Sequence, residues 1–150
     1  MGYYKLYSSS PEAFIFYDDG TIVLCHEIPE DTTHYERMLW PPGCYYNEDL
    51  ERWDIGATGV YRMEGDSIYA NMYFRNCFHF SNRFRLYFST ELWKLKFKIV
   101  DHTTIVWKEK QYMDKEFPIP VVLNDTLLFT TASQLPPPNT EMKKKRWLWY

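Results

Sequence analysis

A stretch near the middle of the chain alternates apolar and charged side chains with a period of two residues. It runs from residue 91 to residue 100, with apolar side chains at Trp93, Leu95, Phe97 and Ile99 and basic ones at Lys94, Lys96 and Lys98. This period is typical of a β-strand with one buried and one solvated face. Strands of this kind belong to antiparallel sheets, because the strands of parallel sheets are usually buried on both faces. We therefore predict an antiparallel all-β fold in which the four apolar side chains face inward and the three lysines face water.

Turn signals between β-prone runs predict the remaining strands. Asp18-Asp19-Gly20, Glu64-Gly65-Asp66 and Asp101-His102-Thr103 each separate two such runs, so hairpins are expected at all three places. Besides 91–100, strands are expected at residues 13–17, 21–25, 59–63, 67–74, 83–89, 104–112, 126–131 and 146–150. A total of about eight or nine strands with regularly spaced turns favours a meander.

Two stretches interrupt the strand pattern. Residues 29–55 are too long for an ordinary connection and contain Pro41-Pro42-Gly43, while Thr33-His34-Tyr35-Glu36 fits a capping box that would open a turn or two of helix. We interpret 29–55 as a long loop, with room for that short helix, that acts as a lid. Residues 135–139 contain three successive prolines, which favours an extended spacer that brings the C-terminal strand from outside the sheet.

Length and charge limit the domain count and the partners. At 150 residues and 18.2 kDa the chain fits a single domain, 1–150, and its 19% of aromatic residues favours half-buried β surfaces. The net charge of −3 arises from 17 basic and 20 acidic residues, which creates no field that would attract nucleic acid. No apolar run approaches the roughly 18 residues of a membrane helix, so no transmembrane segment is expected. The expected location is the cell envelope or periplasm if a leader was removed, and otherwise the cytoplasm.

The C-terminal residues 143–150 combine a basic run with three aromatic side chains. Binders of single-stranded nucleic acid and membrane-surface segments share this composition, but a short basic run beside an edge strand also protects against aggregation. We favour the second interpretation, in which Trp147 and Trp149 close the core and the lysines lie in water.

Cysteine spacing and motif content argue against an enzyme and against a cofactor. Cys25, Cys44 and Cys77 are widely separated, which matches neither a disulfide framework nor a paired CxxC metal site, and their role stays open. Cys77 and His79 would share a face in an extended segment, yet a buried thiol beside a satisfied imidazole is the commoner arrangement. The chain also lacks a P-loop, a dinucleotide fingerprint, a nucleophile elbow and an HExxH pair. We predict no catalytic residues, no metal and no cofactor.

Two of the predicted hairpins resemble a known family. The run 59–68 passes from a G-x-Y strand through Gly65-Asp66 into a second strand, and the run 97–105 closes on a K-I-x-D turn and returns through Thr104-Ile105. Both are similar to hairpins of the lipocalin-like, calycin-type domains of bacterial envelope proteins. The resemblance implies an up-and-down antiparallel barrel of about eight strands, whose interior is either filled by side chains or wide enough for one small ligand.

The long aromatic loop beside a barrel leads to a functional prediction, because ligand pockets favour barrel mouths and apolar linings. We predict a non-enzymatic protein that binds a small hydrophobic or amphipathic ligand at the barrel mouth beneath the 29–55 loop. The candidate contacts are aromatic residues and one methionine, with the first two acting as lid residues: Tyr35, Trp40, Tyr61, Met72, Phe74, Trp93, Phe97 and Trp107. The alternative is an envelope or surface interaction module with a filled core and no ligand, in which Tyr69 and Tyr73 contact another envelope protein or a glycan.

Overall fold

The computed structural model describes the chain in separate ranges. These ranges are residues 2–6, 13–25, 44–47, 52–55, 57–79, 86–113, 120–131, 138 and 140–145. At residues 25, 44–47, 52–55, 74–79, 86–90 and 141 the description is limited to the backbone.

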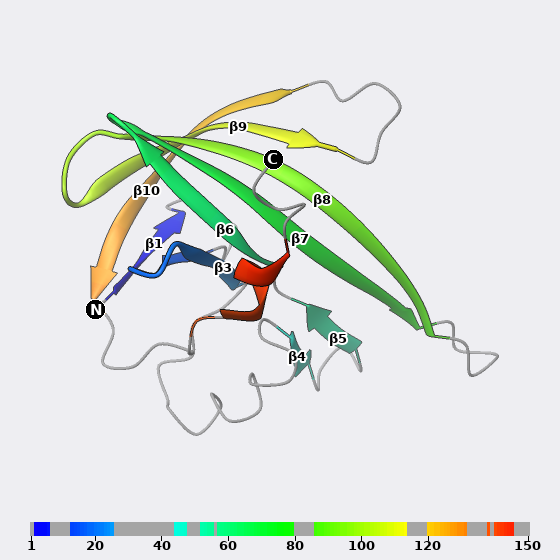
Figure 1. Ribbon diagram of the computed structural model, residues 1–150. Helices are drawn as coiled ribbons and strands as arrows, with labels where there is room; N and C mark the ends of the chain where they lie inside the picture. Colours follow the sequence, from blue (N-terminus) through cyan, green and yellow to red (C-terminus); the bar gives the residue numbers. More distant parts are fainter. Residues whose placement is uncertain are drawn as a thin grey trace.

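Eight strands form one closed antiparallel barrel (Figure 1). They are β1 (Gly2–Leu6), β2 (Ala13–Phe16), β3 (Thr21–Cys25), β6 (Ala57–Glu64), β7 (Ser67–His79), β8 (Leu86–Ile99), β9 (Thr104–Tyr112) and β10 (Val121–Thr131). Their order around the ring is β1-β10-β9-β8-β7-β6-β3-β2, so successive barrel strands are always neighbours. The predicted up-and-down all-β barrel of about eight strands is therefore confirmed.

The two ends of the barrel carry different connections. At the hairpin end, short turns join β2 to β3, β6 to β7 and β8 to β9. Gly20 and Gly65 have φ angles of 82° and 60° in two of these turns, and glycine adopts this left-handed backbone without strain because it has no Cβ atom. In the third turn the Asp101 carboxylate accepts hydrogen bonds of 2.7 Å from both the backbone N–H and the hydroxyl of Thr103. At the opposite end, which we call the loop end, longer stretches of sequence separate consecutive barrel strands: residues 7–12, 26–56, 80–85 and 113–120.

β8 is a single strand where the sequence pattern predicts two. It pairs with β7 without interruption, from Lys98 opposite Ser67 to Leu86 opposite His79. The predicted break near residue 90 is wrong, because Thr90 lies inside this ladder opposite Arg75. The sequence suggests a break because the apolar residues are at even positions up to 88 and at odd positions from 93. Such a change moves the apolar side chains to the other face of the strand, but it does not interrupt the backbone hydrogen bonds.

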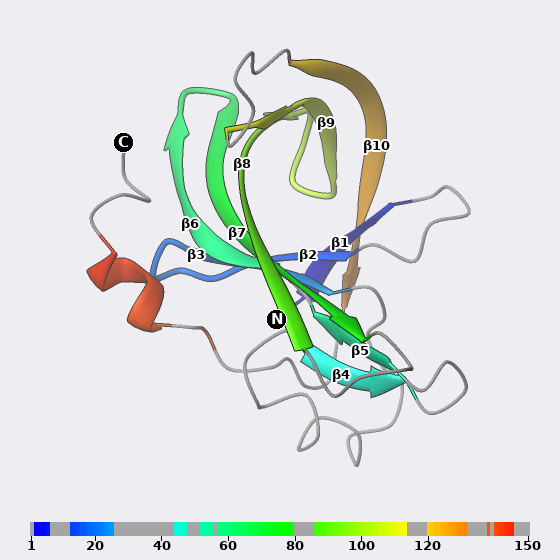
Figure 2. The same cartoon turned by 90° about the vertical axis from the view of Figure 1, so that its right-hand side faces the viewer.

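The stretch 29–55 is not a loop throughout. Within it, β4 (Cys44–Asn47) and β5 (Arg52–Ile55) pair as a separate two-stranded antiparallel sheet, with Tyr46 opposite Trp53. Aromatic residues favour this extended conformation. β5 runs beside β7, which places the small sheet at the loop end (Figure 2). The predicted helical turn at 33–36 lies outside the described residues.

β1 closes the barrel, although the pattern of turns does not single it out as a strand. It pairs with β10, from Gly2 opposite Thr131 to Leu6 opposite Leu127, and with β2 through Tyr4 opposite Phe14. The predicted last strand, 146–150, lies outside the described residues. The short 3-10 helix η2 (Thr140–Lys144), which precedes it, lies outside the barrel beside β3 and β6 (Figures 1 and 2).

Large apolar side chains pack the described interior of the barrel. Phe14 contacts both Phe97 and Trp107 edge to face, with ring centroids 5.1 Å apart in each case. Leu95 and Phe97 are 3% and 0% exposed, while Trp93 and Ile99 are half-buried against the same cluster. The predicted inward face of this strand is thus confirmed, and its lysines lie on the outer face. An eight-stranded barrel is just wide enough to be filled in this way.

Candidate ligand site at the loop end of the barrel

Aromatic side chains close the hairpin end. Phe16 contacts Tyr4 and Tyr61 edge to face, with ring centroids 5.9 and 5.2 Å apart. The Tyr61 hydroxyl donates a 2.8 Å hydrogen bond to the carbonyl oxygen of Tyr17, in the turn between β2 and β3. Tyr61 is therefore held in the fold at the end away from the long connections.

Burial disfavours the ionised forms of Tyr61 and Tyr4, which are neutral at ordinary pH. It raises the pKa of Tyr61, and the carboxylates of Asp18 and Asp19 raise that pKa further. It also raises the pKa of Tyr4, to which Asp101 contributes. Neutral hydroxyls remain hydrogen-bond donors, which suits the contact that Tyr61 makes with the backbone.

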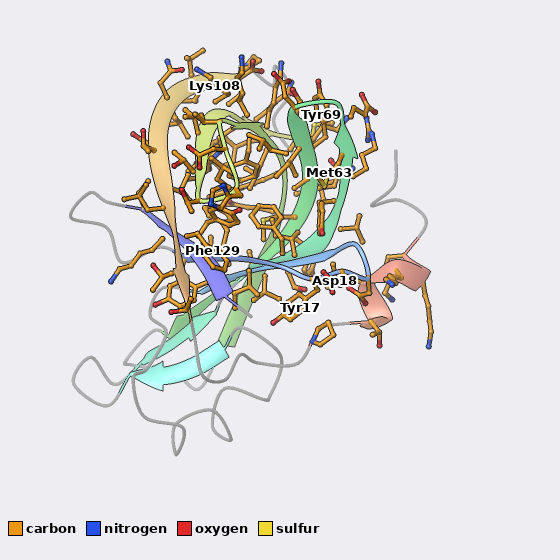
Figure 3. The ribbon with its side chains drawn as sticks, turned by 90° about the vertical axis from the view of Figure 1, so that its left-hand side faces the viewer. Tyr17, Asp18, Met63, Tyr69, Lys108 and Phe129 are labelled. Atoms are coloured by element: carbon orange, nitrogen blue, oxygen red, sulfur yellow. The ribbon has the colours of Figure 1, made fainter. Side chains whose placement is uncertain are left out.

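Asp19 joins the turn at the hairpin end to η2. Its carboxylate accepts hydrogen bonds from the backbone N–H of Thr21 at 3.0 Å and from the Thr21 hydroxyl at 2.6 Å, and the Lys143 ammonium lies 3.1 Å away. Burial alone would raise the pKa of Asp19, but the hydrogen bonds from Thr21 and the charge of Lys143 outweigh it, so the pKa is lowered. Figure 3 shows Asp18, the preceding residue, next to η2.

A β-bulge in β9 changes which of its residues face the interior. Trp107 lies opposite Phe97 and Glu109 lies opposite Lys96, so Lys108 is an extra residue in β9. Beyond the bulge, Lys110 lies opposite Leu95 and Tyr112 lies opposite Trp93. Residues directly opposite one another in an antiparallel pair point to the same side. Lys110 and Tyr112 are therefore on the inner face with Trp93.

The Lys110 ammonium lies among three aromatic rings near the loop end. Its Nζ atom is 3.0 Å from the centroid of Trp93, 5.1 Å from that of Tyr112 and 5.8 Å from that of Trp107. The rings of Trp93 and Tyr112 also meet edge to face, with centroids 4.7 Å apart. A cation within about 6 Å of an aromatic face is attracted to its quadrupole. We call Trp93, Trp107, Lys110 and Tyr112 the loop-end cluster.

Hydrogen bonds fix the two tryptophans of the loop-end cluster. The indole N–H of Trp93 donates to the Glu91 carboxylate at 2.9 Å. The indole N–H of Trp107 donates to the backbone oxygen of Glu109 at 3.0 Å. The cluster therefore presents the apolar surfaces of its rings beside one cationic group, the Lys110 ammonium. Of its two tryptophans, Trp93 is held by a carboxylate.

The structure separates the predicted ligand contacts into groups. Met72, Phe97 and Trp107 lie in the packed core, where they are 0%, 0% and 4% exposed. Tyr61 lies at the hairpin end, and Trp93 is half-buried toward the loop end. Phe74 lies in β7 opposite Glu91, and its side chain is outside the description. Tyr35 and Trp40 lie outside the described residues.

Sequence reasoning did not identify Lys110, Tyr112 and Glu91 as part of a site. A strict two-residue period through β9 extends the inner face from Trp107 to Glu109 and Gln111, and places Lys110 outside. The one-residue bulge reverses that assignment, and no glycine or proline in the segment marks it.

Within the described ranges, no group of three or more His, Cys, Asp or Glu side chains could hold a metal ion. The side chains of Cys77 and His79 are not among those described. Of the helical segments that the structure describes, none has the length and apolarity to cross a membrane.

No family model, no curated protein and no solved structure matches the chain.

Proposed function

We propose that the chain is a lipocalin-like, non-enzymatic protein that binds a small amphipathic ligand at the loop end of its barrel. The apolar part of the ligand would lie against Trp93 and Tyr112, and its polar part would meet the Lys110 ammonium. The observation that carries the proposal is the position of Lys110, a cationic side chain on the inner face of the barrel, next to the apolar cluster that the described residues form there.

General physical reasons support a ligand with two kinds of surface. The Lys110 ammonium lies on the inner face against the ring of Trp93, where it can add a charge-assisted contact to a polar group of a ligand. Small-molecule sites combine mostly apolar walls with a few polar groups that fix orientation. The loop-end cluster has both components, and Trp107 connects it directly to the packed core through Phe97 and Phe14.

A barrel without a ligand, acting as an interaction module, is the second candidate. The tight packing of Phe14, Phe97 and Trp107 favours it, because these side chains fill the interior without help from a ligand. Tyr69 would contribute to such a surface, since its ring lies on the outer face between Arg62 and Lys96, 5.2 and 5.7 Å from their cationic groups.

Two measurements on the purified full chain test the proposal. Native mass spectrometry before and after organic extraction should show a bound small molecule that extraction removes. After extraction, titration with the amphipathic anion 8-anilinonaphthalene-1-sulfonate should change tryptophan fluorescence saturably. Lys110→Met should weaken this response about tenfold, as expected for the loss of a charge-assisted contact in a partly desolvated site.

Lys94→Met is the matched control for Lys110→Met. Lys94 adjoins Trp93 in β8 but lies on the outer face, so its loss removes the same charge from the opposite side of the sheet. The control should titrate like the unmodified chain. A single apo mass together with no saturable fluorescence change would reject the proposal and favour the interaction module.

A further inference from the structure

A hollow of about 390 Å³ lies on the outer face of the barrel. It is formed by the turn between β6 and β7 together with β8, β9 and β10, and its volume is within the range of small-molecule sites. We call it the lysine hollow. Its charged and amide groups belong to Lys96, Lys98, Lys108, Asp66, Glu109 and Asn124.

The lysine hollow lies on the opposite side of the sheet from the loop-end cluster. Lys96 and Lys98 alternate along β8 with the buried Leu95 and Phe97, so they point away from the interior. Figure 3 shows Lys108 at the outer edge of the barrel. A ligand in the hollow would therefore not compete with one at the loop end.

Two adjacent β-bulges shape the lysine hollow. Lys108 is the extra residue of β9 relative to β8. At the same level, β10 also shifts register, because Val122 lies opposite Glu109 and Asp125 lies opposite Trp107. Bulges bend a strand and redirect its side chains, and they are common next to functional sites. Here they bring the neighbours Lys108 and Glu109 to one side of the sheet.

Asn124 completes the bulge in β10 with an unusual backbone. Its φ angle of 62° is in the left-handed region, which asparagine tolerates better than most residues. In this conformation its side-chain oxygen accepts a 2.8 Å hydrogen bond from the Lys108 ammonium. The amide thus orients Lys108 without neutralising its charge.

The acidic partners in the hollow hold the other two lysines loosely. Lys98 Nζ is 3.6 Å from an Asp66 carboxylate oxygen, and these side chains are 54% and 64% exposed. Lys96 Nζ is 3.8 Å from a Glu109 oxygen. Exposed ion pairs of this kind contribute little to stability because solvent screens them. A ligand can therefore displace both carboxylates, and three lysines against two acids already leave a net positive charge.

We propose that the lysine hollow binds a small molecule that carries a phosphate monoester. A bound ligand would take the place of the Asp66 and Glu109 carboxylates beside the lysines, and each carboxylate carries one negative charge. A ligand group with two negative charges is therefore favoured over a group with one. A phosphate monoester has close to two negative charges at neutral pH and three strong acceptor oxygens, which suits a hollow lined by three lysines. This inference does not depend on the function proposed for the loop end.

Isothermal titration calorimetry with phenyl phosphate and phenyl sulfate tests this inference. The two probes have the same ring and nearly the same shape, but the sulfate carries one negative charge. Phenyl phosphate should bind saturably, and its affinity should be about fivefold or more higher than that of phenyl sulfate. The reason is that its second negative charge adds to the attraction by the ammonium groups. The double variant Lys98→Gln/Lys108→Gln should weaken phenyl phosphate binding about tenfold or more.

Lys5→Gln/Lys94→Gln is the control, because it removes the same charge from the outer face without changing the hollow. All four lysines are at least partly exposed, so circular dichroism should show both variants folded. Three results would overturn the inference: no saturable heat with phenyl phosphate, equal affinity for the two probes, or equal weakening in the control.

Discussion

At the hairpin end of the barrel, Phe16 lies between Tyr4 and Tyr61, and the Tyr61 hydroxyl is satisfied by a backbone oxygen of the adjoining turn. Toward the loop end, Trp93 and Tyr112 lie against the ammonium of Lys110. Both ends are lined by aromatic rings. At the hairpin end the rings contact one another and a backbone oxygen. At the loop end the rings lie against a charged side chain on the inner face.

From this difference we propose that stability depends mainly on one end of the strands and ligand binding on the other. Edge-to-face contacts among neutral rings contribute to stability and require no ligand. A cation beside ring faces is also attracted to them, and an ammonium group can in addition form a charge-assisted hydrogen bond with an acceptor of a ligand. We therefore expect substitutions at the hairpin end to affect unfolding, and substitutions at the loop end to affect binding.

The largest expected effect compares one ring from each end. Phe16→Ala should lower the free energy of unfolding by about 3 kcal/mol, near the lower limit for truncation of a core phenylalanine, because Phe16 contacts three other rings. Tyr112→Ala should lower it by only about 1 kcal/mol, a common value for a half-buried side chain. Urea denaturation followed by circular dichroism measures both. Equal losses would show that the two ends do not differ in this respect.

An intermediate effect is expected from Tyr61→Phe, which removes one hydroxyl and keeps the ring. Its 2.8 Å hydrogen bond to the Tyr17 carbonyl is lost, so the free energy of unfolding should fall by about 1 kcal/mol. The response to 8-anilinonaphthalene-1-sulfonate should not change. Tyr69→Phe, on the outer face, is the control and should leave both quantities as they are. A weakened probe response in Tyr61→Phe would contradict the separation of the two ends.

The smallest expected effect depends on pH. The pKa of Asp19 is lower in the folded chain than in the unfolded one. Its contribution to stability is therefore present above the unfolded pKa of about 3.9 and is lost as the pH falls through the folded pKa. Asp19→Asn should reduce stability at pH 7 by a few tenths of a kcal/mol, since the partly exposed pair with Lys143 is screened by solvent, and should flatten the fall in stability below about pH 4.

Urea midpoints at pH 7 and pH 3 measure this effect. Lys143→Gln should produce only part of it, because the hydrogen bonds from Thr21 to Asp19 remain. An unchanged pH dependence in Asp19→Asn would show that this carboxylate does not link the turn to η2 energetically.

The strands were predictable where local patterns agree with the tertiary structure. The hairpins around Gly20, Gly65 and Asp101 have both a turn signal and a period of two on each side, and all three are present. β1 was not singled out because its partner in β10 is distant in the sequence, and pairing of that kind leaves no local signal. β8 appeared as two strands because a change in which face is apolar resembles a break.

Only the two tryptophans of the candidate site were predictable from the sequence. Trp93 and Trp107 were identified because large rings within alternating strands face a core. Lys110 depends on a single inserted residue, Lys108, whose effect appears only when β9 is aligned with β8. The lysine hollow depends on a second register shift, in β10, at the same level. Relations between neighbouring strands of this kind cannot be read from the period of either strand alone.

The pairing of β1 with β10 also affects the order in which the chain can fold. Gly2 lies opposite Thr131, so the first strand to leave the ribosome must wait for the last barrel strand before its hydrogen bonds are complete. Until then, β1 and β9 are both open edges, and open edges can pair with other chains. Loop closure over such a separation is also slow compared with hairpin formation. A nascent or truncated chain that ends before residue 121 would therefore be the species most in need of a chaperone.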